Sequence, residues 1–434
     1  MNAHKTIRVI VCVTALTVLT LGFYSNAWKV ADNYWFDGFA NLTESFIIGR
    51  LAKSRQSGVF SEGGLIGREV KIPKGEHQSS YQYEIYYNDI PIRQYRHYRS
   101  NPAIQGVIFS ILDRNISSEP QTKVKFFKFL AAIISASILS IFLLWVLDVF
   151  GLFTTLMSLL LIVLSPWLTV AGGHLFWMFG TIYIPFLIPL ILLHKESKGR
   201  ELSFRLWFLS IALAVLFKCL FTGFELITTT LVMMTMPVFF YALWQKWRPR
   251  LFVRRFFTAS LAGILGVIAC TVILSIQIAQ VDGGMQKGWE HIQHRLLFRT
   301  YPSGENIPQK IKDTVKVPMT TVIKTYLGGR ALSLPTGSGH YSLSFGGLLL
   351  FFAVISAMIF VTSRSGPLTA LTITTWISIL APLSWFIIFK SHSVRHPHLD
   401  YLAWYMPTLL LMYSCVFSFF SGMLSRRPFK TPVT

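Results

Sequence analysis

Three acidic residues with aromatic neighbours follow the first hydrophobic run of the chain. Asp32, Asp37 and Glu44 belong to the stretch DNYWFDGFANLTESF, which also carries Trp35. A carboxylate at a boundary between water and lipid can act as a general base on an acceptor hydroxyl or amine. Asp37 and Glu44 are seven residues apart, so they share a face if the segment is helical. We take Asp37 and Glu44 as candidate catalytic acids and Trp35 as a site-lining residue. Asp32 is a further candidate base, and simple solvation of the loop is the alternative.

Two further charges lie deep in apolar sequence. Lys218 and Glu225 belong to the segment FKCLFTGFELIT. Charges within membrane-spanning sequence are costly and usually functional. We therefore expect both residues to line the site, with a structural ion pair across the TG turn as the alternative.

A third polar group lies in residues 389–405, FKSHSVRHPHLDYLAWY, and it comprises Lys390, His392, Arg395, His396, His398 and Asp400. His392 and His396 are four residues apart, as two metal ligands on a helix can be, but Pro397 disfavours a continuous helix. The internal Glu of a zinc-hydrolase helix is also absent. A cationic, hydrogen-bonding pocket for a phosphate group fits these residues better than a metal site. A solvated basic loop is the alternative, and a requirement for a divalent cation is left open.

Other cations and aromatic residues could complete such a site. Arg330 precedes the eighth apolar run, and we predict that it binds the same phosphate, to which Arg295 and Arg299 could add. His174 and Trp177 lie in the aromatic segment 172–192 and could face a pocket. Packing within an interfacial aromatic belt is the simpler interpretation of that segment.

The composition indicates a membrane protein. Hydrophobic residues make up 53% of the 434 residues and charged residues 14%, whereas soluble domains carry roughly 25% charge. The mean hydropathy is +0.51. The net charge of +21 is explained by basic cytoplasmic loops rather than by nucleic-acid binding. The four cysteines lie in apolar runs without a CxxC pair, so neither a disulfide framework nor a zinc site is indicated.

Ten segments are apolar over roughly the 20 residues that a spanning helix needs. They are residues 7–27, 127–149, 152–171, 174–193, 206–222, 225–245, 256–279, 345–362, 367–389 and 401–421. Two long hydrophilic segments, 28–125 and 281–344, separate them. We read the first apolar run as an uncleaved span rather than a signal peptide.

The distribution of charge predicts the orientation. With ten spans, the basic short segments fall on one side of the membrane; they are the N-terminus and residues 194–205, 245–255, 362–366 and 425–430. Basic loops stay in the cytoplasm. Of the 19 acidic residues, ten lie in 28–125 and four in 281–344. We therefore predict a single all-α polytopic membrane domain with both termini inside and both long segments outside, in the periplasm of a bacterium.

Local patterns predict the structure of the outer segments. The tyrosine-rich alternation in residues 81–98 favours a short hairpin. Residues 101–116 have apolar side chains at helical spacing, and residues 288–301 form a second candidate helix. Both are too short to span, and we expect them to lie in the membrane interface.

These residues together resemble the GT-C superfamily of integral-membrane glycosyltransferases, in particular its uncharacterised bacterial members. The similarity lies in the acid-bearing loop after the first span, the aromatic fourth span, TGFE between spans five and six, and SHSVRHPHLDYLAWY before the last span. The resemblance implies a polyprenyl-phosphate sugar as donor and transfer to an envelope glycan, lipid or protein at the outer face of the bacterial inner membrane. It also implies that an acid of the first outer loop, here Asp37, acts on the acceptor. The chain departs from the better-known branches in having WFDG where they have an adjacent acidic pair, and in lacking a large soluble C-terminal domain.

Other functions stay open at this point. A transporter or lipid flippase would place charges at the bilayer midplane and contain broken spans. A membrane acyltransferase would use His392 or His396. A non-catalytic assembly partner would need neither these histidines nor Asp37. No GxGxxG or Walker pattern indicates a soluble nucleotide site.

Overall fold

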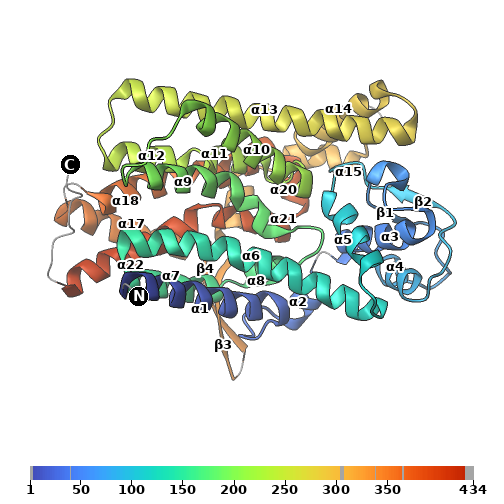
Figure 1. Cartoon of the computed structure of the whole chain (residues 1–434), viewed down its shortest axis with the longest axis horizontal. Helices are drawn as coiled ribbons and strands as arrows, with labels where there is room; N and C mark the ends of the chain where they lie inside the picture. Colours follow the sequence, from blue (N-terminus) through green and yellow to red (C-terminus); the bar gives the residue numbers. More distant parts are fainter. Residues whose placement is uncertain (1–2, 40, 304–306, 338, 364–365, 426–434) are drawn as a thin grey trace.

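Long apolar helices make up most of the structure, a computed structural model that describes residues 3–39, 41–303, 307–337, 339–363 and 366–425 (Figure 1). Within these residues eight helices are long and apolar enough to cross a membrane, or ten if each of two bent pairs is one span. The eight are α1 (Ala3–Ser25), α6 (Pro120–Phe150), η2 with α9 (Phe179–Glu196), α10 (Phe204–Thr222), α11 with α12 (Ile227–Trp244), α13 (Pro249–Asp282), α17 (Phe345–Thr362) and α18 with α19 (Pro367–Ile388). The chain is thus an all-α polytopic membrane protein. The predicted basic segment 425–430 lies outside the described residues apart from Ser425.

Two predicted spans are broken. In place of residues 152–171, α7 (Leu152–Val163) and α8 (Pro166–Gly172) meet at an angle of 75°. In place of residues 401–421, the segment Pro397–Tyr405 and α22 (Thr408–Ser425) meet at 42°. Pro166 and Pro407 stand at the two breaks, and proline has no N–H with which to continue a helix.

Proline and glycine also set the ends of the two longest helices. α6 begins at Pro120 and ends before Gly151, whose φ is +87°. α13 begins at Pro249 and ends before Gly283, whose φ is +79°. Proline suits the first helical position and glycine the left-handed residue after the last. The 34 residues of α13 extend about 50 Å, more than the hydrocarbon thickness of about 30 Å, so the helix reaches beyond a bilayer.

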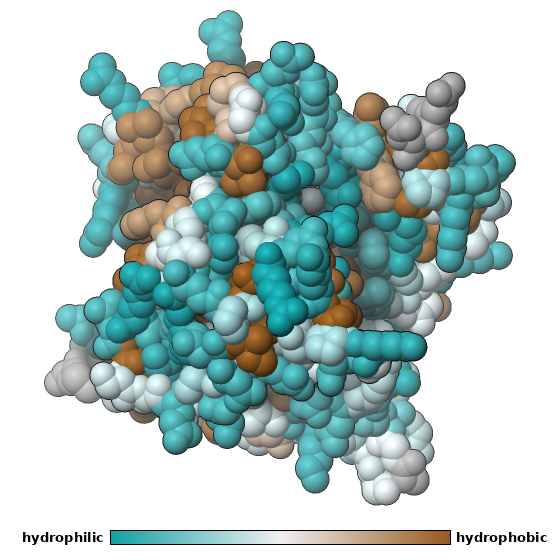
Figure 2. Space-filling view, turned by 90° about the vertical axis from the view of Figure 1, so that its right-hand side faces the viewer, coloured by the Kyte–Doolittle hydropathy of each residue, from teal (hydrophilic) through white to brown (hydrophobic). Residues whose placement is uncertain are grey.

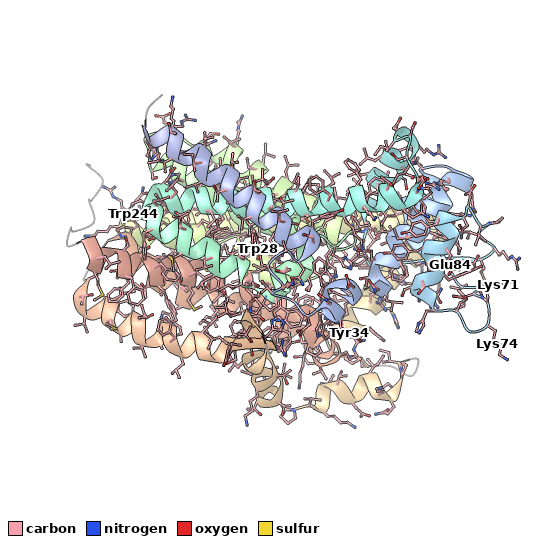
Figure 3. All side chains as sticks on the ribbon, turned by 90° about the horizontal axis from the view of Figure 1, so that it is seen from below. Trp28, Tyr34, Lys71, Lys74, Glu84 and Trp244 are labelled. Carbon is pink, nitrogen blue, oxygen red and sulfur yellow. The ribbon has the colours of Figure 1, made fainter. Side chains whose placement is uncertain are left out.

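The first hydrophilic segment forms a small domain at the right of Figure 1. The segment begins with α2 (Asn33–Gly38), which packs against α8. The domain itself comprises α3 (Asn41–Ser57), η1 (Ser61–Gly64), β1 (Gly67–Glu69), α4 (Gln78–Tyr87), β2 (Tyr95–His97) and α5 (Ile104–Asn115). β1 and β2 pair antiparallel, with Arg68 opposite Arg96. The end of the molecule that carries this domain is mostly hydrophilic (Figure 2). Lys71, Lys74 and Glu84 lie at this end, and Trp244 lies toward the opposite end (Figure 3).

The predicted hairpin over residues 81–98 is wrong, because most of its first half is helical. Gln82, Ile85 and Tyr86 are the buried residues of α4, and their spacing of three and four positions is that of one helical face. This face packs against α3. Only Tyr95–His97 of the predicted hairpin is a strand, and it pairs with β1.

The predicted amphipathic helix at 101–116 is confirmed as α5. Its buried residues include Phe109 and Asp113, whereas Ile108 and Ile111 are exposed by 37% and 42%. Part of the apolar stripe read from the sequence is therefore exposed, whereas Ile104 and Leu112 of the same stripe pack against the core. Such a stripe suits the predicted position in a membrane interface.

The second hydrophilic segment and residues 389–405 supply the remaining elements. These are α14 (Met285–Arg299), α15 (Gln309–Lys312), η3 (Asp313–Lys316), α16 (Met319–Gly328), β3 (Arg330–Thr336), β4 (Gly339–Ser344), α20 (Lys390–Arg395), α21 (Pro397–Asp400) and η4 (Tyr401–Tyr405). α14 confirms the helix predicted at 288–301, and it packs against both α13 and α20. The second hydrophilic segment is thereby brought against residues 390–395.

Candidate functional site

Asp37 is exposed and lines a cavity of about 610 Å³. The other lining residues come from α3, α4 and α6, and they are Asn41, Ser79, Ser80, Tyr83, Tyr87, Gln121, Val124, Lys125 and Lys128. Ion pairs of the described residues engage Asp32 and Glu44 but not Asp37. Within the described residues the Asp37 carboxylate thus makes no ion pair, and it shares its cavity with Lys125 and Lys128.

This cavity lies at one end of a spanning helix. Lys125 and Lys128 belong to the first turns of α6. Phe126 and Phe129 of the same turns are exposed by 43% and 39%. These two rings give the start of α6 an exposed apolar surface. A carboxylate, two ammonium groups and an apolar surface thus lie close together.

Glu44, the second candidate acid, is held in a buried network instead. Its carboxylate lies 2.7 Å from the Lys128 Nζ and accepts a 2.5 Å hydrogen bond from the Tyr83 hydroxyl. The His174 Nε2 is 3.9 Å away, and the Leu175 N–H donates from 3.4 Å. Burial would raise the pKa of the Glu44 carboxyl, but the charges of Lys128 and His174 outweigh burial and lower the pKa to about 2. Glu44 therefore joins α3, α4 and α6 as an ionised structural group.

The predicted site-lining residues His174 and Trp177 shape the turn that precedes η2. The His174 Nδ1 accepts hydrogen bonds from the N–H groups of Phe176 (3.2 Å) and Trp177 (3.3 Å). Trp177 is buried, and its indole N–H has no acceptor within the described residues. These side chains border the Glu44 network rather than the cavity of Asp37.

Replacing Glu44 by glutamine is expected to lower stability at neutral pH and to flatten its acid dependence. Because the folded pKa of about 2 lies below the ordinary value of 4.5, the contribution of Glu44 is complete above pH 4.5. This contribution to stability is lost as the pH falls from 4.5 toward 2, because over this range Glu44 binds a proton in the unfolded chain before it does so in the folded chain. Thermal unfolding in detergent should show a large difference from wild type at about pH 7 and a smaller one at about pH 3.5. Glu84→Gln, at an exposed position of α4, is the matched control. An unchanged difference across this range would show that Glu44 is not the group that titrates.

A second group of charges is buried where α14, α20 and the turn after α10 meet. The Glu225 carboxylate lies 2.5 Å from the Arg299 Nη2 and 3.7 Å from the His392 Nε2. The other ring nitrogen of His392 is 3.1 Å from the Asp400 carboxylate. Burial would raise the pKa of Glu225, but Arg299 and His392 outweigh it and keep the pKa below its ordinary value. We call Glu225, Arg299, His392 and Asp400 the buried charge cluster.

Lys218 stabilises the turn that carries Glu225. Its ammonium group donates to the backbone carbonyls of Gly223 (2.9 Å) and Glu225 (2.5 Å). Gly223 has a φ of +58°, and a Cβ at this position would lie 2.2 Å from the Asn101 Cβ. Only glycine fits this turn.

The predicted phosphate-binding residues separate into different settings. Arg395 lies over the Phe298 ring at 4.6 Å, and burial together with Arg299 and Arg295 lowers its pKa to about 10. His396 packs on His392 with ring centroids 4.8 Å apart. Burial and the neighbouring charges of His392 and Arg395 lower the pKa of His396 to about 4. These two residues border the buried charge cluster.

Lys390 and Arg330 are engaged elsewhere. The Lys390 ammonium donates to the Val315 carbonyl at 2.7 Å and so attaches α20 to η3. Arg330 pairs with Asp32 at 3.2 Å, and His340 lies 3.2 Å from the other oxygen of the same carboxylate. Asp32 therefore joins the first hydrophilic segment to the β3–β4 hairpin.

Trp35 links the first hydrophilic segment to residues 389–405. Its ring lies 5.8 Å from that of His398 and 6.0 Å from that of Trp167. Trp35 and Asp37 are two residues apart on α2, so their side chains point about 200° apart. The structure thus brings Trp35 to the histidine-rich loop but directs Asp37 toward α4 and α6.

Sequence reasoning missed three residues of the Asp37 cavity, namely Tyr83, Lys125 and Lys128. The signal was present as two lysines three positions apart, next to phenylalanines, at the start of an apolar run. The predicted span began at residue 127 and so divided this group, whereas α6 begins at Pro120. Among the described residues, no group of three or more His, Cys, Asp or Glu side chains could hold a metal ion.

The fold and these sites define a multi-pass membrane protein with a polar domain at one end. No family model, curated protein or solved structure matches the chain.

Proposed function

We propose that this protein is a membrane glycosyltransferase that moves a sugar from a polyprenyl phosphate to an envelope glycan, lipid or protein. One observation carries the proposal: the Asp37 carboxylate, which makes no ion pair with a described residue, shares a cavity with Lys125 and Lys128 at the end of a spanning helix. The resemblance to the GT-C superfamily supports the same assignment. The proposal includes a bacterial inner membrane and a site that faces the periplasm.

The reaction needs a base for the acceptor and cations for the departing phosphate. Asp37 removes the proton of the acceptor hydroxyl, whose oxygen attacks the anomeric carbon of the sugar. The bond from that carbon to the phosphate oxygen breaks, and the polyprenyl phosphate leaves with the electron pair. The ammonium groups of Lys125 and Lys128 stabilise its charge. The exposed Phe126 and Phe129 border the path of the lipid chain. The sequence predicted that residues 390–396 bind the phosphate. In this proposal Lys125 and Lys128 bind it instead, because they line the same cavity as the base.

The test is sugar transfer in membranes supplied with radiolabelled polyprenyl-phosphate sugars. Wild-type protein is expected to consume at least one of these donors, and Asp37→Asn is expected to stop that consumption at an equal protein level. If no lipid-linked sugar is consumed, the glycosyltransferase assignment fails.

A transporter or flippase is the second candidate, because two bent helix pairs interrupt the spans at angles of 75° and 42°. Broken helices are typical of transporter binding sites. Movement of a labelled lipid-linked sugar across proteoliposomes without cleavage would favour this function. An acyltransferase based on His392 has less support, since both ring nitrogens of that residue face carboxylates.

A further inference from the structure

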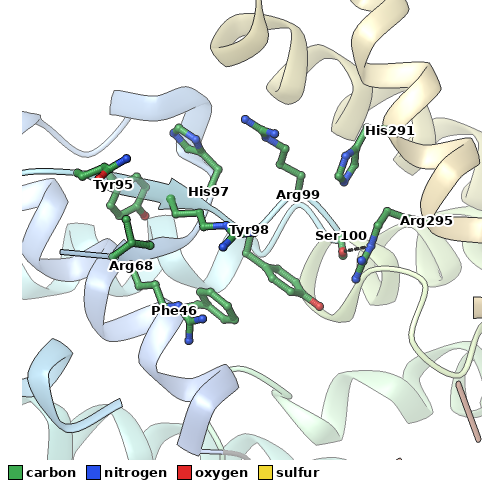
Figure 4. Close-up of a pocket in the computed structure, with 12 residues that line it drawn as sticks. Phe46, Arg68, Tyr95, His97, Tyr98, Arg99, Ser100, His291 and Arg295 are labelled. Carbon is green, nitrogen blue, oxygen red and sulfur yellow. Dashed lines mark hydrogen bonds between the residues drawn. The ribbon is translucent and has the colours of Figure 1, made fainter. Parts of the chain in front are cut away.

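A second cavity, of about 630 Å³, lies between the small domain of the first hydrophilic segment and α14 (Figure 4). Its lining is rich in cationic and histidine side chains, namely Arg68, Arg96, His97, Arg99, His291 and Arg295. Arg68, Arg96 and His97 come from the β1–β2 strands, and His291 and Arg295 come from α14. Arg99 lies between these two walls (Figure 4). We call this the cationic cavity.

Few carboxylates balance these charges. Arg99 pairs with Asp282 at 2.6 Å, and His97 lies 2.7 Å from a Glu62 oxygen. Within the described residues, neither Arg68 nor Arg295 lies within ion-pair distance of a carboxylate. The Arg68 guanidinium lies 4.8 Å above the Phe46 ring, and Arg295 donates from its Nε to the Ser100 hydroxyl at 3.1 Å.

Several buried nitrogens of the cationic cavity also lack a hydrogen-bond acceptor among the described residues. They are the Arg68 Nε and Nη1, the Arg99 Nε and the His291 Nε2. Native proteins rarely leave buried donors without acceptors, since their desolvation is then uncompensated. Three residues with such nitrogens line one cavity, so an acceptor-rich ligand is the simplest explanation.

The pKa of His291 indicates a positive electrostatic potential in the cationic cavity. Burial and the charges of Arg295 and Arg99 lower the pKa of this imidazole to about 4. Burial and the charge of Arg96 likewise lower the pKa of Arg68. Like charges that face one cavity are stabilised by an anion between them.

We propose that the cationic cavity binds a phosphate or diphosphate group. Guanidinium groups form bidentate hydrogen bonds with phosphate oxygens, and donors on two opposing walls suit a group with several such oxygens. The volume of about 630 Å³ exceeds that of a bare phosphate and falls within the usual range of about 300–1,000 Å³ for small-molecule sites. This site is separate from the proposed transfer centre, because the cavities of Asp37 and of Arg68 have no lining residue in common.

An apolar cavity of about 200 Å³ adjoins the cationic cavity. The two share Arg99, Ser100 and Arg295. The remaining lining of the apolar cavity includes Phe224, Ile227, Val267 and Leu274. The phosphate group could therefore belong to a soluble molecule or to the head of a lipid whose chain enters the apolar cavity.

Titration of full-length protein in uncharged detergent with inorganic diphosphate tests the site. Thermal unfolding and calorimetry should both show binding by wild type at constant ionic strength. Arg68→Gln is expected to weaken the affinity at least about tenfold, in line with the loss of a charge-assisted bidentate contact. Arg93→Gln is the matched control, since Arg93 is exposed in the same domain and does not line the cavity. If Arg68→Gln fails to fold, Arg96→Gln at an exposed lining position replaces it.

A second titration with a long-chain polyprenyl diphosphate distinguishes the two sources. Affinity at least about tenfold above that of inorganic diphosphate supports a lipid head group, and equal affinity supports a soluble ligand. Absence of binding by wild type, or equal binding by the lining variant and Arg93→Gln, would overturn the proposal. Asp37→Asn should retain diphosphate binding, so failure of the transfer assignment leaves this result unaffected.

Discussion

Asparagine in place of Asp37 is expected to lower sugar transfer by about 10²–10⁴-fold, the usual contribution of a general base. Asparagine keeps the shape of the side chain but cannot take a proton from the acceptor. Because Asp37 is exposed, the free energy of unfolding should change by less than about 0.5 kcal/mol. The measurement is initial-rate transfer from a labelled polyprenyl-phosphate sugar, with the thermal midpoint of each variant determined in parallel.

Two further variants define what a loss of activity means. Lys125→Gln removes one of the two cations of the same cavity, and it should also slow transfer if the lysines stabilise the departing phosphate. Asp32→Asn should keep activity, because Asp32 pairs with Arg330 and His340 away from this cavity. Full activity of Asp37→Asn together with loss of activity in Asp32→Asn would move the base to Asp32.

Alanine in place of Glu225 is expected to destabilise the protein by about 3–5 kcal/mol, the effect of removing one partner from a buried ion pair. Glu225 is 6% exposed and contacts Arg299 at 2.5 Å and His392 at 3.7 Å. Its loss leaves the Arg299 charge buried beside other cations. Chemical or thermal unfolding in detergent measures the change.

The matched control is Glu290→Ala on α14. Glu290 is exposed, so its removal should change stability by less than about 0.5 kcal/mol. The double replacement Glu225→Leu with Arg299→Leu should destabilise less than Glu225→Leu alone, because no unpaired charge then stays buried. Equal effects of Glu225→Ala and Glu290→Ala would show that the buried charge cluster does not contribute to folding.

Local patterns predicted the candidate acids but not their roles. Asp32, Asp37 and Glu44 have similar surroundings in the sequence, yet Glu44 is buried beside Lys128, Asp32 pairs with Arg330, and Asp37 lines a cavity. Each partner comes from an element far along the chain. No periodicity within the first hydrophilic segment contains that information.

The charged loops show the same limit of prediction from local sequence. The segment 389–405 was predicted as one phosphate pocket, but Lys390 attaches α20 to η3 and His392 bridges Glu225 and Asp400. Arg299 was a minor candidate from the sequence, and it makes the shortest contact to Glu225. The cationic cavity was not predicted, because its arginines come from separate segments with unremarkable local patterns.

The sequence by itself determined the polytopic helical class and the approximate bounds of the apolar helices. Hydropathy over roughly 20 residues is a local property, and for this reason the predicted span 345–362 coincides with α17 (Phe345–Thr362). Only the tertiary structure decided where two predicted spans bend, that residues 78–87 form a helix, and which charges meet. Those features depend on how distant elements pack, since a buried charge is stabilised by partners that packing brings within a few ångströms.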